Sequence, residues 1–189
     1  MAEDPISDRR RSHEEEYFQK KDRELVEKMR QQAKAQEQLR ELGEQVGVTD
    51  PEVSRELAEL GFTVETVKLL PLIPVLEMAW AEGGVTTRER KMVVDVARAR
   101  GIAEGSAADR QLSEWLDRQP PDSLYRRAGR LIGALFASEG RFEFTPDDLL
   151  KHCEAIAEAS GGIFGIGRVS SGERATLARI ADEIKNRQK

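Results

Sequence analysis

The sequence predicts an all-α protein in which a bundle of paired helices follows a long N-terminal helical arm. Residues 12–42 contain no Gly or Pro and consist mostly of Glu, Lys, Arg, Gln and Leu, which favour helices. Farther along, one glycine-containing phrase occurs twice, each time between two segments whose apolar residues have helical spacing. No segment alternates apolar and polar residues as a strand would, the nearest being residues 141–145.

The charged arm, residues 1–45, carries only a thin seam of apolar residues. The positions that recur every seven residues are Phe18, Leu25, Gln32, Leu39 and Val46, with Met29 and Leu42 nearby. Because polar residues occupy most of the other seam positions, the helix cannot form a stable core alone. We therefore expect it to dock on another surface, to pair as a coiled coil with a second copy of the chain, or to fray.

After the arm, a connecting segment of residues 46–63 contains a short helix over residues 51–60, and the bundle domain covers residues 64–189. We expect the bundle helices at residues 64–82 with a bend at two prolines, then at 87–100, 107–118, 122–138, 146–159 and 171–187. The apolar residues expected in the core are Leu72, Ile73, Leu76, Trp80, Val93, Val96, Leu112, Leu116, Leu131, Leu135, Leu149, Ile156, Leu177 and Ile180.

The repeated phrase is first of all a connector between helices. Its first copy covers residues 81–90, and its second covers residues 159–174 with five inserted residues. Gly ends the preceding helix in each copy. Thr86 with Glu89, and Ser170 with Glu173, then have the spacing of a capping box that begins the next helix. Capping alone explains these residues, but it does not require Glu82, which precedes the glycines of the first copy.

With Glu82 included, the phrase resembles the connectors of the TerB-like domain family, which is associated with tellurite resistance. The resemblance covers about residues 64–185 and implies a bundle of paired helices. Acidic residues of this phrase are candidate metal ligands in the family, which implies a site for Ca²⁺ or another divalent cation at Glu82, Glu89 and Glu173. The second copy departs from the pattern, because Ser160 stands in the place of Glu82.

The start of the arm has a second, shorter resemblance. Residues 9–25 combine paired acidic residues, Tyr17-Phe18 and Arg-Glu in a charged helix, and so are similar to the inhibitory helix of the mitochondrial ATPase inhibitor protein. That resemblance implies insertion of the helix into a rotary F-type ATPase. The residues expected to contact a protein partner are Tyr17, Phe18, Leu25 and Met29, because aromatic and large apolar side chains contribute most interface energy. The alternative is a structural arm with a solvated charged face.

Composition excludes several classes of protein. The net charge of −5 argues against a general nucleic-acid binder. The longest apolar run, residues 69–81, is interrupted and shorter than the ~20 residues of a membrane span, so we expect no membrane insertion. One cysteine in the chain fits a reducing compartment, and residues 1–11 lack the apolar core of a secretory signal. We therefore expect a cytoplasmic protein.

Two further motifs resemble ligand-binding or catalytic sites, but we expect them to have structural roles. The glycine-rich residues 161–167 follow a helix rather than a strand and lack the lysine of a phosphate loop, so we expect a connector in which Phe164 contacts the core or a partner. His152 and Cys153 lie side by side with no zinc set or orienting third group, and Cys153 is expected to be buried.

The sequence thus predicts a protein that is not an enzyme. We expect an interaction or stress-response module of the TerB-like type with a metal-linked acidic connector. The alternative is a regulator that inhibits a rotary F-type ATPase by inserting its N-terminal helix.

Overall fold

The computed structural model describes residues 5–137, 145–160 and 170–185, and all elements within these residues are helical. The all-α prediction is thus confirmed. In chain order the elements are α1 (Pro5–Gln45), α2 (Pro51–Glu59), the 3₁₀-helix η1 (Val67–Leu72), α3 (Ile73–Ala79), α4 (Thr87–Ala99), α5 (Ala107–Asp117), α6 (Asp122–Ala137), α7 (Pro146–Ser160) and α8 (Ser171–Lys185). Most boundaries lie within a few residues of those expected from the sequence.

The largest difference concerns residues 64–82, where one bent helix was expected. The segment instead contains η1 followed by the short helix α3. Pro71 lies inside η1 and Pro74 in the first turn of α3. Because proline has no backbone N–H to donate, a continuous α-helix would lose hydrogen bonds at both positions, and the tighter 3₁₀ turn separates the two parts.

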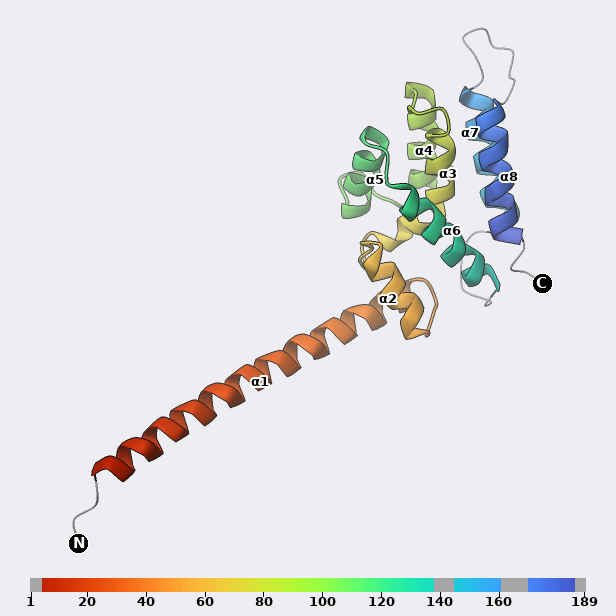
Figure 1. Cartoon of the computed structure of the whole chain (residues 1–189). Coiled ribbons are helices and arrows are strands. Elements are labelled where there is room, and N and C mark those ends of the chain that lie inside the picture. Colours follow the sequence, from red (N-terminus) through yellow and green to blue (C-terminus); the bar gives the residue numbers. More distant parts are fainter. Residues whose placement is uncertain (1–4, 138–144, 161–169, 186–189) are drawn as a thin grey trace.

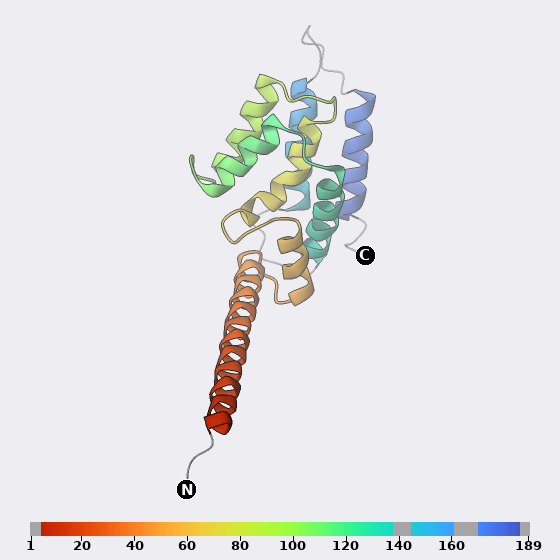
Figure 2. The ribbon, with the colours of Figure 1, turned by 60° about the vertical axis from the view of Figure 1, so that its left-hand side comes forward.

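Helix α1 projects from the bundle along nearly its whole length (Figure 1), and a turn of the molecule by 60° shows the same projection (Figure 2). Only the inner end of α1 joins the core, where Leu42 and, just after the helix, Val46 are buried. Gly43 lies between them because α2 and the loop before it approach closely there. A Cβ atom at Gly43 would lie 2.8 Å from the carbonyl oxygen of Val48 and would also collide with Ser54 Oγ.

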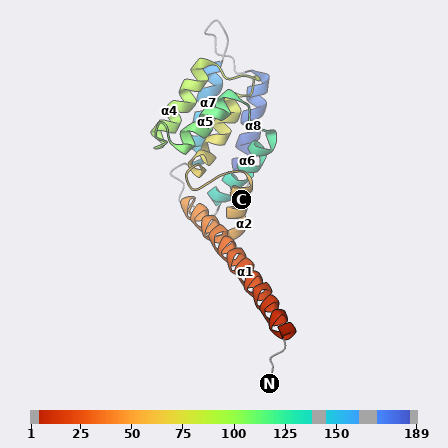
Figure 3. The same cartoon turned by 90° about the vertical axis from the view of Figure 1, so that its left-hand side faces the viewer.

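The bundle is arranged around α3, which packs against α4, α6, α7 and α8. Figure 3 shows these helices grouped at one end of the molecule, with the arm extending from the other. A single core cluster runs from Leu42 in α1, through Leu57 in α2, to Ile180 in α8. Of the residues expected in the core, Trp80, Val96 and Leu177 are partly buried and the others are buried.

Candidate functional site

The arm carries a group of exposed apolar side chains that the bundle lacks. Among the residues whose side chains the structure describes, the large hydrophobic residues that are exposed all lie on α1: Tyr17 (58%), Phe18 (62%), Leu25 (57%), Val26 (47%) and Met29 (60%). We call these five residues the α1 stripe. Phe18, Leu25 and Met29 are separated by seven and four residues, so they share one face of the helix, while Tyr17 and Val26 flank it.

The two aromatic residues of the stripe contact each other rather than the bundle. The ring centroids of Tyr17 and Phe18 are 5.9 Å apart with an edge-to-face geometry, and Lys21 Nζ lies 5.8 Å from the centroid of the Tyr17 ring. Such contacts are weak at an exposed position. Both rings therefore keep most of their surface in water, which is unfavourable unless another molecule covers them.

In the first connector, the structure confirms the capping box that starts α4. The backbone N–H of Thr86 donates to Glu89 Oε2 at 2.7 Å, and the backbone N–H of Glu89 donates to Thr86 Oγ1 at 3.2 Å. Glu89 is only 2% exposed, whereas Glu82 is exposed at the start of the connector. One carboxylate oxygen of Glu89 is thus already used to begin a helix.

The second connector uses the same arrangement at the start of α8. The backbone N–H of Ser170 donates to Glu173 Oε2 at 2.6 Å, and the backbone N–H of Glu173 donates to Ser170 Oγ at 3.1 Å. Glu173 is 1% exposed. The repeated phrase therefore produces the same local structure twice, although the intervening residues differ.

The starts of α4 and α8, where the two capping boxes lie, are at the same end of the bundle, away from the arm (Figure 1). A Cβ atom at Gly172, in the first turn of α8, would lie 3.5 Å from the carbonyl oxygen of Ala81. Nevertheless, no group of three or more His, Cys, Asp or Glu side chains that could hold a metal ion occurs among the described residues. The proposed ligands Glu82, Glu89 and Glu173 therefore do not form such a group by themselves.

The structure also contains a partly buried ionic network that the sequence analysis did not identify. Arg179 of α8 forms an ion pair with Glu77 of α3 and a second, 2.8 Å long, with Glu183 one turn later. Burial raises the pKa of Glu77 above its ordinary value of 4.5, an effect that the positive charge of Arg179 opposes. The one available signal was Glu77 itself, a charged residue in the middle of an apolar run.

Tyr125 of α6 belongs to the same region. Its hydroxyl oxygen is buried and has no hydrogen-bond partner among the described residues. Burial raises the pKa of this phenol, and the negative charges of Glu77 and Asp122 add to the rise. The hydroxyl therefore stays protonated throughout the physiological range, which does not suit it to act as a base.

The adjacent residues His152 and Cys153 have different surroundings. Cys153 is fully buried with a free thiol, and burial raises the pKa of that thiol to about 12, with further contributions from Glu77 and Glu154. Because the thiolate is the reactive form, this cysteine is not an activated nucleophile. His152 Nδ1 contacts the carbonyl oxygen of Asp148 one turn earlier, at 2.6 Å. Phe164 lies outside the described residues.

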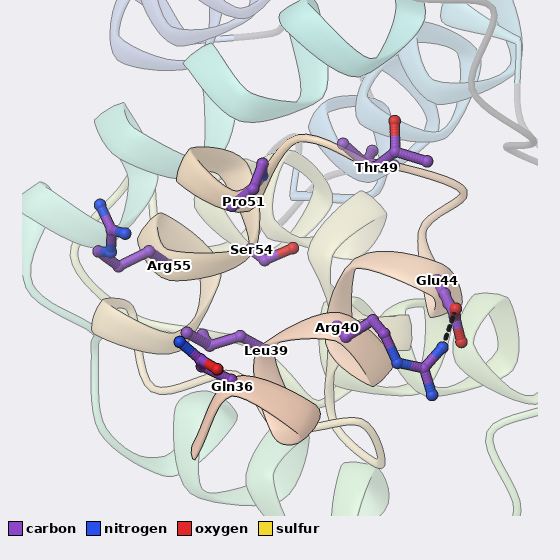
Figure 4. A pocket seen from close by; sticks show the side chains of 9 residues that line it. Gln36, Leu39, Arg40, Glu44, Thr49, Pro51, Ser54 and Arg55 are labelled. Atoms are coloured by element: carbon purple, nitrogen blue, oxygen red, sulfur yellow. Dashed lines mark hydrogen bonds and ion pairs between the residues drawn. The ribbon is translucent and has the colours of Figure 1, made fainter. Parts of the chain in front are cut away.

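Two grooves flank the base of the arm, on either side of Leu39. The first has a volume of about 400 Å³ and is shown in Figure 4, where Arg40 pairs with Glu44 beside Leu39 and Ser54. The second has a volume of about 600 Å³ and includes the apolar side chains of Leu42 and Phe62. The seam of α1 therefore ends in open, partly apolar surface before it enters the core.

None of the described helices combines the length and the apolar character that crossing a bilayer demands. Comparison with known proteins gave no match to a family model, to a curated protein or to a solved structure.

Proposed function

We propose that this chain is a non-enzymatic interaction module of the TerB-like type, which binds a protein partner through the α1 stripe. The observation that carries the proposal is that all the exposed large hydrophobic side chains of the described residues gather within thirteen positions of one projecting helix. Scattered exposed apolar residues are ordinary, whereas a contiguous group is typical of an interaction surface.

The energetics of the helix support a partner. Between Tyr17 and Gln38, α1 is exposed at every residue, so no tertiary contact stabilises this part. Its ion pairs, such as Lys21 with Glu24 at 3.7 Å, are exposed and contribute little. Because most helical stability in proteins comes from packing of an apolar face, a partner that covers the stripe would stabilise both the helix and the apolar side chains.

The test is recovery of partners from native lysate with the full-length chain. The Leu25→Glu variant places a charge in the stripe and should lose the partner, as should the double variant Tyr17→Ala, Phe18→Ala. The matched control is Gln38→Glu, which makes the same charge change on the face of the exposed helix opposite Phe18, Leu25 and Met29 and should retain it. If the two stripe variants recover as much partner as the wild type and the control do, the stripe has no role in binding.

The metal-linked part of the proposal concerns the first connector, where Glu82 is exposed and Glu89 holds its cap. Calcium usually takes six to eight oxygen ligands, so backbone carbonyls and water would have to complete the site. Saturating Ca²⁺ should then raise the unfolding midpoint by several degrees. Glu82→Gln should abolish this rise while the matched variant Glu104→Gln, on another exposed loop, leaves it unchanged; no rise in the wild type would refute the metal site.

A second candidate function is inhibition of a rotary ATPase by insertion of the arm. It is favoured by one specific observation, the adjacent Tyr17 and Phe18 rings presented together on an uncovered helix. The test is ATP hydrolysis by an isolated F-type ATPase in the presence of the full-length chain. Inhibition that disappears with the Tyr17→Ala, Phe18→Ala variant would support this candidate, and undiminished hydrolysis with excess wild-type chain would eliminate it.

A further inference from the structure

We infer that the α1 stripe pairs with the stripe of a second copy of this chain, with the two arms antiparallel. The inference rests on the proposed function, because it names the partner that the stripe binds. Three features carry it, namely the position of the stripe along the arm, the order of charges along α1 and the apolar area that is exposed.

The stripe lies at the middle of the uncovered part of α1. The helix begins at Pro5, and the first of its described residues to be buried in the core is Leu42, so the uncovered part is centred on Arg23. The stripe, from Tyr17 to Met29, is centred on the same residue. A two-fold axis beside this point therefore places each stripe directly on the other.

The same axis matches the two arms over their full length. Tyr17 of one copy lies opposite Met29 of the other, and the start of each helix reaches the level of Glu41 in its partner. Neither arm overhangs, and the two bundles lie at opposite ends of the pair, where they do not collide. A parallel pair would leave the stripes aligned as well, but both bundles would then compete for space at one end.

The seam of α1 already serves as a helix interface at its inner end. Leu42 and Val46 pack in the core with α2, which lies against this end of α1. The outer seam residues Phe18 and Leu25 continue the same seven-residue spacing beyond the reach of α2. A second arm thus extends an existing helix-to-helix contact along the same face.

The order of charges favours the antiparallel arrangement. The arm contains a basic block, Arg9 to Arg11, and an acidic block, Glu14 to Glu16. In a parallel pair each block would lie level with its own copy, and like charges at close range are repulsive. In the antiparallel pair the basic block lies level with Glu37, and the acidic block lies between the levels of Arg30 and Lys34.

The exposed area fits a reversible dimer. Five side chains at about half to two-thirds exposure offer roughly 100 Å² each, so two stripes offer roughly 1,000 Å² of apolar surface. Specific interfaces bury about 1,200–2,000 Å² in total, and the aliphatic stems of long polar side chains along the seam can supply the difference. An interface of this size, with few large anchors, should associate weakly and respond to concentration.

Sedimentation equilibrium of the purified full chain tests the pairing. We expect the mean mass to rise from one copy to two with concentration. Leu25→Glu should raise the dissociation constant about a hundredfold. Each dimer loses two apolar contacts, and each contact contributes a factor of roughly ten to the affinity. Gln38→Glu, on the opposite face and not level with the acidic block, should dimerise as the wild type does. A wild type that stays monomeric, or a Leu25→Glu variant that dimerises equally well, would overturn the inference.

Orientation is tested with a spin label at a cysteine introduced by Gln45→Cys, at the exposed end of α1 beside the bundle. The native Cys153 is fully buried and should not be labelled. At ~1.5 Å per residue, the antiparallel pair places the two labels roughly 60 Å apart, whereas a parallel pair places them roughly 20 Å apart. A short distance would overturn the antiparallel arrangement.

The two proposals fail in different ways. If the purified chain is monomeric but the wild type still recovers another protein that Leu25→Glu loses, the stripe is an interaction surface and only the second copy is the wrong occupant. If the chain is monomeric and no recovery depends on the stripe, both proposals fail.

Discussion

The inner end and the outer part of α1 belong to one continuous helix, yet they depend on different forces. At the inner end, Leu42 is 3% exposed and packs with α2, whereas Leu25 on the same seam is 57% exposed and contacts no other element. The inner end is therefore stabilised by burial, and the outer part by helix propensity alone in a single copy. An apolar seam in the sequence therefore identifies a surface that needs to be covered, but it does not identify the molecule that covers it.

Replacement of the buried leucine should have the largest effect. Leu42→Ala removes a buried side chain and leaves a cavity, so we expect a loss of about 3 kcal/mol in the free energy of unfolding. Leu25→Ala should change it by less than about 0.5 kcal/mol at concentrations where the chain is monomeric. Urea unfolding followed by circular dichroism measures both. Similar losses at the two positions would contradict the distinction between the covered and uncovered seam.

Next in size is the effect of a methyl group at Gly43, where α1 meets the loop before α2. The new Cβ would lie 2.8 Å from the carbonyl oxygen of Val48, a backbone atom that cannot move away alone. We expect Gly43→Ala to cost about 1–3 kcal/mol. The matched variant Gly84→Ala has no atom within 4 Å of its new Cβ and should be nearly neutral. Thermal unfolding measures both variants. An unfolding midpoint for Gly43→Ala equal to that of the wild type would contradict a close contact between the inner end of α1 and the loop before α2.

In the bundle, the capping box at the start of α4 should contribute a smaller stabilisation than the buried contacts of α1. Thr86→Ala removes the side-chain oxygen that accepts from the backbone N–H of Glu89, and should cost about 1 kcal/mol. Thr87→Ala, one position later, has no capping role to lose and serves as the control. Equal unfolding midpoints for the two variants would mean that α4 does not depend on its cap.

The smallest expected effect is a pH dependence from Glu77. Its pKa is raised in the folded state, so the folded protein holds this proton more tightly than the unfolded chain does. The stabilisation is complete below the ordinary pKa of 4.5 and is lost as pH rises through the raised value. Urea unfolding at several pH values should therefore show the wild type gaining stability over Glu77→Gln as pH falls toward 4.5. If the difference in the free energy of unfolding between the two proteins instead moves against the wild type as pH falls, the direction of the Glu77 pKa shift is wrong.

Local sequence was a reliable guide wherever local chemistry fixes the backbone. The Thr86 and Glu89 pair and the Ser170 and Glu173 pair were expected to cap helices, and both do so through hydrogen bonds within four residues. The split of residues 64–82 into η1 and α3 was missed, because proline marks a bend without revealing whether the turn before it becomes 3₁₀.

Contacts between distant residues were beyond the reach of sequence patterns. The ion pair between Glu77 and Arg179 joins α3 to α8 across about a hundred positions of sequence, and nothing in the spacing of either residue selects the other. The same holds for the metal hypothesis, since whether Glu82 and Glu173 lie close together depends on how two connectors are placed.

The sequence by itself determined the helices, their caps and the seven-residue seam of α1, because propensity, capping and periodicity act over a few neighbouring residues. Only the tertiary structure decided which part of that seam is covered. Burial depends on where α2 and the bundle lie in space, and they cover Leu42 and Val46 while leaving Phe18, Leu25 and Met29 in solvent.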